Sequence, residues 1–186
     1  MHIVLATLHV RPSAQAVSLA AACLAAALPE DLRRQTRLLD LFPDEDDEQM
    51  LKTIFAGRPD VVAFPLYLWN RHRVLTLARS LRQRRPGLFL LAGGPEATTD
   101  PEGVLAEGEL DAVIRGEGEI TFRDLLTARD QGIEPAGLAG LTLRTATGVV
   151  AGPERAAVAH LDDLPSPWLT GTLTPAVLQT LVEAVP

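Results

Sequence analysis

The sequence predicts a doubly wound α/β domain built on a five-stranded parallel sheet. Five short runs rich in Val, Ile, Leu and Phe begin at residues 2, 36, 60, 88 and 111, close to the roughly 30-residue βαβ repeat. The runs are mostly continuous rather than alternating, which is typical of strands covered by helices on both faces. Of the 186 residues, 47% are hydrophobic, enough for a sizeable core.

The elements are expected in strict alternation. The predicted strands are residues 2–7, 36–41, 60–65, 88–92 and 111–115. Apolar residues at helical spacing predict a first helix at 14–28, with Pro12 suited to its first turn. Further helices are expected near 50–55, 71–85, 101–107 and 120–126. After Gln131 the pattern changes to a β-hairpin at 141–144 and 149–151, then a proline-rich connector at 160–168, and a short helix at 175–185.

Composition excludes several classes of protein. A net charge of −7 argues against a general nucleic-acid binder. The first charged residue, Arg11, follows the first apolar run, so no secretory signal is expected. The alanine-rich stretch 14–28 is shorter than the ~20 residues of a membrane span, and the cytoplasm is the expected compartment. The single cysteine, Cys23, rules out a disulfide framework or a cysteine-ligated iron–sulfur cluster within this chain.

A ligand is expected at one edge of this sheet, because open parallel sheets bind ligands beyond the carboxyl ends of their strands. Gly93 and Gly94 allow the backbone to approach a bulky ligand. Tyr67 and Trp69 add flat apolar surface, and Asn70 adds a donor and an acceptor. These residues suit a large, flat, mostly apolar ligand with amide groups. A plainer interpretation remains open, in which the glycines form a tight turn and the aromatic side chains pack in the core.

Other chemistries lack their motifs. The first glycine is Gly57, too late for a dinucleotide fingerprint, and neither a phosphate loop nor a G-x-S-x-G elbow occurs. Pro65 follows the third strand where a phospho-receiver domain would have an aspartate. We interpret His9 as a hydrogen-bonded turn residue and Glu119 as favouring a helix start. No catalytic or metal-ligating residue is predicted.

Three segments carry a family resemblance. Residues 61–70 (VVAFPLYLWN), 91–96 (LAGGPE) and 111–122 (DAVIRGEGEITF) resemble the N-terminal cobalamin-binding domain of cobalamin-dependent radical SAM enzymes. Residues 140–144 and 161–171 (LDDLPSPWLTG) resemble the segment leading into their radical SAM barrel. The resemblance implies a flavodoxin-like fold that holds cobalamin over the carboxyl ends of the strands, with the nucleotide tail between loops. The cofactor contacts it implies are Leu8, His9, Pro65, Tyr67, Trp69, Asn70, Gly93, Gly94, Pro95, Glu96, Gly116, Glu117 and Gly118.

The resemblance also implies a division of labour. Residues 1–131 would form the cobalamin-binding domain, 132–159 a hairpin extension, and 160–186 a linker toward a C-terminal radical SAM domain. That missing domain would hold a [4Fe–4S] cluster and S-adenosylmethionine, commonly for methyl transfer. With one cysteine, this chain alone is expected to be inactive, either as a fragment or as a standalone relative that works with a partner. The alternative is a cofactor-free flavodoxin-like interaction domain.

Two departures from the family pattern support that alternative. Relatives that supply a histidine to cobalt have Asp-x-His-x-x-Gly, whereas this chain has Thr7-x-His9-x-x-Pro12. A histidine that ligates a metal is normally oriented by a hydrogen-bond acceptor, and without the aspartate this acceptor is expected to be absent. We therefore predict that no histidine of the protein ligates the cobalt. Pro65 also stands where relatives often have a small hydroxyl residue, which removes one hydrogen bond to the tail.

Overall fold

The computed structural model describes residues 1–13 and 16–173 and contains one mixed sheet in that part of the chain. The parallel strands are β1 (Ile3–Leu8), β2 (Thr36–Leu41), β3 (Val61–Pro65), β4 (Phe89–Gly93) and β5 (Ala112–Ile114). The hairpin strands β6 (Leu141–Thr145) and β7 (Gly148–Ala151) extend the same sheet, with β6 antiparallel to β5. The order β2-β1-β3-β4-β5-β6-β7 confirms the flavodoxin-like parallel core, with its switch point between β1 and β3.

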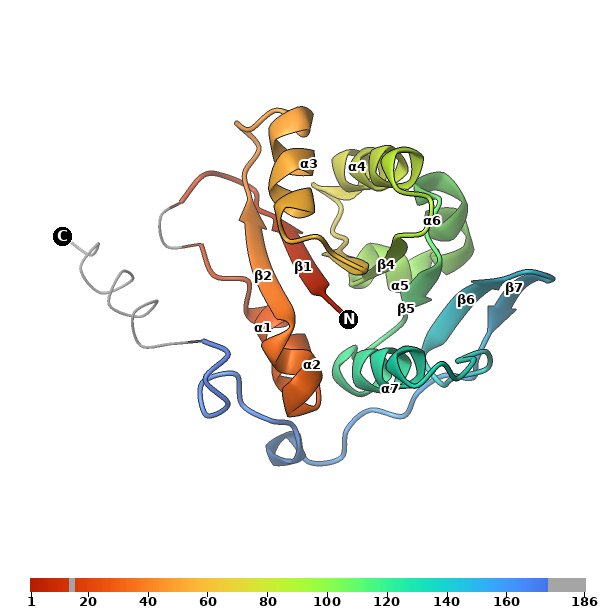
Figure 1. The fold of residues 1–186 in the computed structure, drawn as a ribbon. Helices are drawn as coiled ribbons and strands as arrows, with labels where there is room; N and C mark the ends of the chain where they lie inside the picture. The colour runs from red at the N-terminus through yellow and green to blue at the C-terminus, as the bar shows by residue number, and fades with distance from the viewer. Residues whose placement is uncertain (14–15, 174–186) are drawn as a thin grey trace.

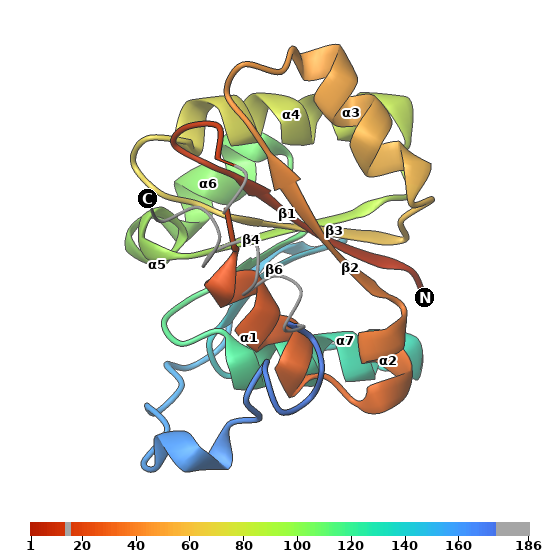
Figure 2. The ribbon, with the colours of Figure 1, turned by 90° about the vertical axis from the view of Figure 1, so that its left-hand side faces the viewer.

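Helices cover both faces of the sheet, as Figure 2 shows. The helices α3 (Asp47–Ala56), α4 (Arg71–Arg84) and α6 (Pro101–Gly108) lie on one face. The helices α1 (Leu19–Ala27), α2 (Glu30–Arg34) and α7 (Glu119–Asp130) lie on the other. Successive strand residues point to opposite faces, so Val4 packs in the first core and Ile3 in the second. This double covering explains why the strands read as continuous apolar runs.

The first helix differs from the sequence prediction. It begins at Leu19 rather than near residue 14, so Pro12 lies in the preceding loop and not in a first helical turn. The loop is held instead by the Ser18 hydroxyl, which lies 2.6 Å from the Thr7 hydroxyl at the end of β1. The short helices α2 and α5 (Pro95–Thr99) were not predicted.

After β7 the chain forms a connector, residues 152–173, which contains a 3-10 turn at Leu161–Asp163. Figures 1 and 2 show it passing from β7 beneath α7 to the side of α1. Leu173, its last described residue, is only 6% exposed. The helix expected at 175–185 lies outside the described residues. Within the described part, no helix has the length and apolar character needed to cross a bilayer.

Candidate functional site

An apolar cavity of about 260 Å³ lies at the carboxyl edge of the sheet, between α1 and the ends of β3, β4 and β5. The fifth wall is formed by residues 116–118, in the loop between β5 and α7, and by Glu119, the first residue of α7. Seven residues expected to contact a ligand line this cavity: Pro65, Tyr67, Gly93, Gly94, Gly116, Glu117 and Gly118. The other six lie outside its lining: Leu8, His9, Trp69, Asn70, Pro95 and Glu96.

The first turns of α1 keep this cavity open. Ala20 and Ala21 line it with small side chains, and Leu24 forms the wall one turn later. On the opposite side, a Cβ added to Gly118 would lie 3.0 Å from Leu24 Cδ2, so the helix and the loop are already in close contact there. These α1 residues were not among the ligand contacts predicted from the sequence. The available signal was the pair of alanines at the helix start, where larger side chains usually fill the space above a sheet.

The paired glycines have different structural reasons. Gly94 has φ +99°, and a Cβ on it would lie 2.8 Å from the Leu66 carbonyl oxygen. The two loops are joined there by the Leu66 N–H, which donates to the Gly93 carbonyl at 2.7 Å. Gly94 therefore fits the plainer interpretation of a tight approach between loops. At Gly93 a Cβ would have ordinary contacts of 3.6 Å with the Ile114 carbonyl oxygen.

An aromatic pair forms the rim of the cavity. Tyr67 and Trp69 stack with their ring centroids 4.5 Å apart and an angle of 4° between the rings. Trp69 is 59% exposed and its neighbour Leu68 is 81% exposed, so the interpretation of both aromatic side chains as core residues is wrong for Trp69. Large apolar side chains exposed beside a cavity are typical of a binding surface.

Asn70 is buried, and its amide is occupied by the backbone. Its Nδ2 donates to the Pro65 carbonyl at 3.0 Å and to the Leu8 carbonyl at 3.4 Å. Its Oδ1 accepts the Tyr67 N–H at 2.8 Å. The side chain thus fixes the loop after β3 to the end of β1. Leu8 itself is buried in the core beneath α3 and α4.

Glu96 faces α4 rather than the cavity. Its carboxylate accepts from Arg71 Nη1 at 3.4 Å, and Arg71 also contacts Asp100 at 3.1 Å and Glu107 at 3.2 Å. The hydrogen bonds that Arg71 donates, to Asp100 first and then to Glu107 and Glu96, raise the pKa of Arg71 against the opposing effect of burial. This ion-pair cluster joins α4 to α5 and α6.

His9 is a hydrogen-bonded residue, as predicted, but its partner was not. Its Nε2 lies 2.6 Å from Asp40 Oδ1, and its ring stacks on Phe42 with centroids 5.5 Å apart. The expectation that an orienting acceptor is absent is therefore wrong. Asp40 comes from β2, where the parallel register places it beside Thr7 of β1. Because His9 Nε2 is hydrogen-bonded to Asp40, the geometry agrees with a structural role for this histidine, which joins the end of β1 to β2.

The carboxylate of Glu117 is bound to the connector and not to the cavity. Its Oε2 accepts the N–H of Val158, in the connector, at 3.0 Å. The residue therefore lines the cavity while its charged end holds another segment of the chain. Gly116 beside it has φ +71° and open space where a Cβ would lie.

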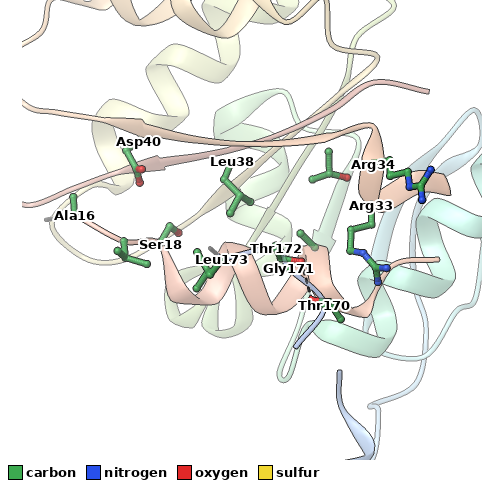
Figure 3. A pocket seen from close by; sticks show the side chains of 13 residues that line it. Ala16, Ser18, Arg33, Arg34, Leu38, Asp40, Thr170, Gly171, Thr172 and Leu173 are labelled. Atoms are coloured by element: carbon green, nitrogen blue, oxygen red, sulfur yellow. Dashed lines mark hydrogen bonds between the residues drawn. The ribbon is translucent and has the colours of Figure 1, made fainter. Parts of the chain in front are cut away.

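A larger cavity of about 490 Å³ lies beside the edge strand β2 (Figure 3). Its walls include Arg33, Arg34 and Asp40, and Figure 3 shows Leu38 pointing from β2 toward Leu173 at the end of the connector. None of the residues expected to contact a ligand line it. It lies on the flank of the sheet, so the cavity at the carboxyl ends of β3, β4 and β5 is the candidate site.

Comparison with known proteins identifies a family and similar proteins. The B12 binding domain family matches residues 7–126. The chain is 34% identical over 121 residues to the cobalamin-dependent radical SAM methyltransferase TokK of Streptomyces tokunonensis, which covers 64% of this chain and 18% of that protein. It has the same identity and coverage with 2-(S-pantetheinyl)-carbapenam-3-carboxylate methyltransferase of Streptantibioticus cattleyicolor.

Structural comparison agrees on the fold. The structure of the cobalamin-dependent S-adenosylmethionine radical enzyme OxsB with aqua-cobalamin and S-adenosylmethionine bound has a TM-score of 0.73 to this chain. The two are 17% identical, and the match covers 96% of this chain and 25% of that one. This chain thus spans less than a fifth of the two methyltransferases and a quarter of the solved chain.

Proposed function

The chain belongs to the B12 binding domain family and resembles the cobalamin module of radical SAM methyltransferases, and from this premise we propose that it carries cobalamin for a radical SAM domain. In this proposal the nucleotide tail of the cofactor occupies the apolar cavity at the carboxyl edge. The corrin ring lies outside the cavity, over the exposed rim. The observation that carries the proposal is the open cavity itself, at the edge of the sheet where ligands of this fold class bind.

The residues present fit such a ligand. Pockets that enclose a whole small molecule usually measure about 300–1,000 Å³, so a cavity of about 260 Å³ suits a flat heteroaromatic base and not a macrocycle. Its walls are mostly apolar, from α1 and the strand ends, as expected for a base that stacks rather than ionises. Outside it, Tyr67, Leu68 and Trp69 offer exposed apolar surface to a larger ring.

The roles of individual residues follow from their positions. Ala20, Ala21 and Leu24 would bound one face of the base and exclude water from it. Gly93 and Gly116 would bring backbone close to the cofactor without a side chain between. When bound, cobalamin supplies a cobalt–carbon bond for methyl transfer. The [4Fe–4S] cluster and S-adenosylmethionine would belong to the rest of the protein.

The alternative, a cofactor-free interaction domain, has less support. An empty apolar cavity lowers the free energy of unfolding, so a domain that no longer binds a cofactor is expected to have this space filled by side chains. Here the alanines of α1 keep that space, and no side chain of the described residues fills it.

Binding of hydroxocobalamin tests the proposal. The purified chain is incubated with hydroxocobalamin, desalted, and examined by visible absorption, and we expect about one equivalent to remain bound. Ala20→Phe places a ring in the cavity from the first turn of α1 and takes up the space of the ligand, so it should weaken binding by roughly 10-fold or more, which is about 1.4 kcal/mol. Ala106→Phe is the matched control, on the exposed side of α6 across the sheet, and should bind like the unmodified chain. A colourless protein after desalting contradicts the proposal.

A further inference from the structure

Loop residues 116–118, together with Glu119 at the start of α7, separate two cavities. One is the candidate cofactor site of about 260 Å³. The other, of about 230 Å³, lies between this loop, Ile120 and connector residues 155–158. Gly116, Glu117 and Glu119 line both cavities. Any molecule that fixes one side of this thin wall therefore restricts the other side.

The connector is bound to this wall and to the helix that follows it. Glu117 Oε2 accepts the Val158 N–H at 3.0 Å. Arg155 Nε donates to Thr121 Oγ1 at 2.7 Å, and its Nη2 donates to Asp124 Oδ2 at 3.0 Å. Thr121 and Asp124 both belong to α7, so Arg155 holds the connector to the helix while Glu117 holds it to the loop. The connector thus leaves the sheet along a fixed path.

Glu117 holds the connector to a loop, whereas Arg155 holds it to a helix. Glu117 stands between two glycines, and Gly116 has φ +71° with no atom near its missing Cβ. Glycine backbone has more accessible conformations than any other, so ordering this loop has a large entropic cost. Two contacts that order the same loop share this cost, and each then favours the other.

We infer that Glu117 is a positioning residue that couples occupancy of the candidate cofactor site to the seating of the connector. Glu117 does so through its hydrogen bond to Val158, without contact between its carboxylate and the cofactor. The inference rests on the proposed function, because it requires cobalamin in the cavity.

Amide exchange tests this coupling. Deuterium uptake over residues 153–160 is measured with and without hydroxocobalamin, and the cofactor should slow exchange at Val158 by roughly 2- to 10-fold, the range of one net hydrogen bond. Glu117→Ala should speed this exchange and should raise the Kd for hydroxocobalamin by a similar factor, since coupling between two sites is reciprocal. Glu117→Gln keeps an oxygen acceptor and should restore most of both effects.

The controls separate the inference from the proposed function. Glu154→Ala removes an exposed carboxylate from the same connector and should change neither exchange nor affinity. A protein that binds hydroxocobalamin with unchanged exchange at Val158 would overturn the coupling alone. Equal effects of Glu117→Ala and Glu117→Gln would also overturn it, because the hydrogen-bond acceptor would then be irrelevant. A protein that retains no colour would overturn the proposed function and the coupling together.

Discussion

Asn70 shows that a polar residue at a ligand edge can serve the loop rather than the ligand. From the sequence, its amide was expected to face the cofactor. In the structure Asn70 is 2% exposed and its amide bonds three backbone groups, in Leu8, Pro65 and Tyr67. It therefore supports the rim indirectly, by fixing the segment that carries Tyr67.

We predict that Asn70→Ala lowers the free energy of unfolding by about 1–3 kcal/mol, because it leaves the Tyr67 N–H without its partner. Urea unfolding followed by circular dichroism measures this change. Gln83→Ala, at an exposed position of α4, is the control and should stay within about 0.5 kcal/mol of the unmodified chain. Equal midpoints for the two variants would contradict the role of Asn70 as a structural anchor.

Sequence patterns predict a residue best when its local backbone conformation requires that residue type. Gly94 was predicted from its position after a strand, and its φ of +99° and close approach to Leu66 explain it. The pairing of His9 with Asp40 was missed because the two residues are 31 positions apart and meet only through the β1–β2 register. A contact of this kind requires the strand order, which no local motif records.

At the scale of elements, the helix α1 explains both the cavity and an error in prediction. Its alanine-rich sequence favours a helix over 14–28, yet the helix begins at Leu19, directly after Ser18, whose hydroxyl lies 2.6 Å from that of Thr7 in β1. Periodicity identified the helix correctly but not its start. The start matters most here, since it places Ala20 and Ala21 at the cavity.

The packing of α1 against α7 can be followed through Cys23. Burial, and then the charge of Glu119 at the start of α7, raise the pKa of the Cys23 thiol. Only the thiolate reacts with iodoacetamide, so Cys23 should react more slowly near pH 8 than free cysteine and should need a higher pH to reach half its maximal rate. Glu119→Gln removes one of the two causes and should lower that pH.

Glu102→Gln is the control for this measurement, because it removes a carboxylate from the first turn of α6, on the opposite face of the sheet. Its alkylation profile should match that of the unmodified chain. If Glu119→Gln left the profile unchanged as well, then α1 and α7 would not be packed in solution as they are here.

For the whole molecule, the sequence was sufficient for the parallel core and insufficient for its extension. Five apolar runs separated by helices leave few arrangements once crossovers are right-handed and both faces must be covered. The hairpin at 141–151 was also predicted, but its pairing partner was not. Leu141 and Leu143 are buried in the same core as α1 and α7, so β6 completes the sheet beside β5. The boundary at residue 131 stays a prediction.

Truncation tests whether residues 1–131 fold as an independent unit. A chain cut after residue 131 loses β6 and exposes the β5 edge together with the core that Leu141 and Leu143 cover. Burial of one leucine contributes about 1.5–3 kcal/mol, so we expect the cut chain to lose about 3–6 kcal/mol of unfolding free energy. A chain cut after residue 159 keeps β6, β7 and the anchors of Arg155, and should lose much less. Urea midpoints of the three chains measure the difference, and equal midpoints for the two shortened chains would mean that the hairpin is an appendage. A large loss of unfolding free energy in the shorter chain alone would instead mean that the candidate cofactor site needs the sheet from β1 to β6 in order to be stably folded.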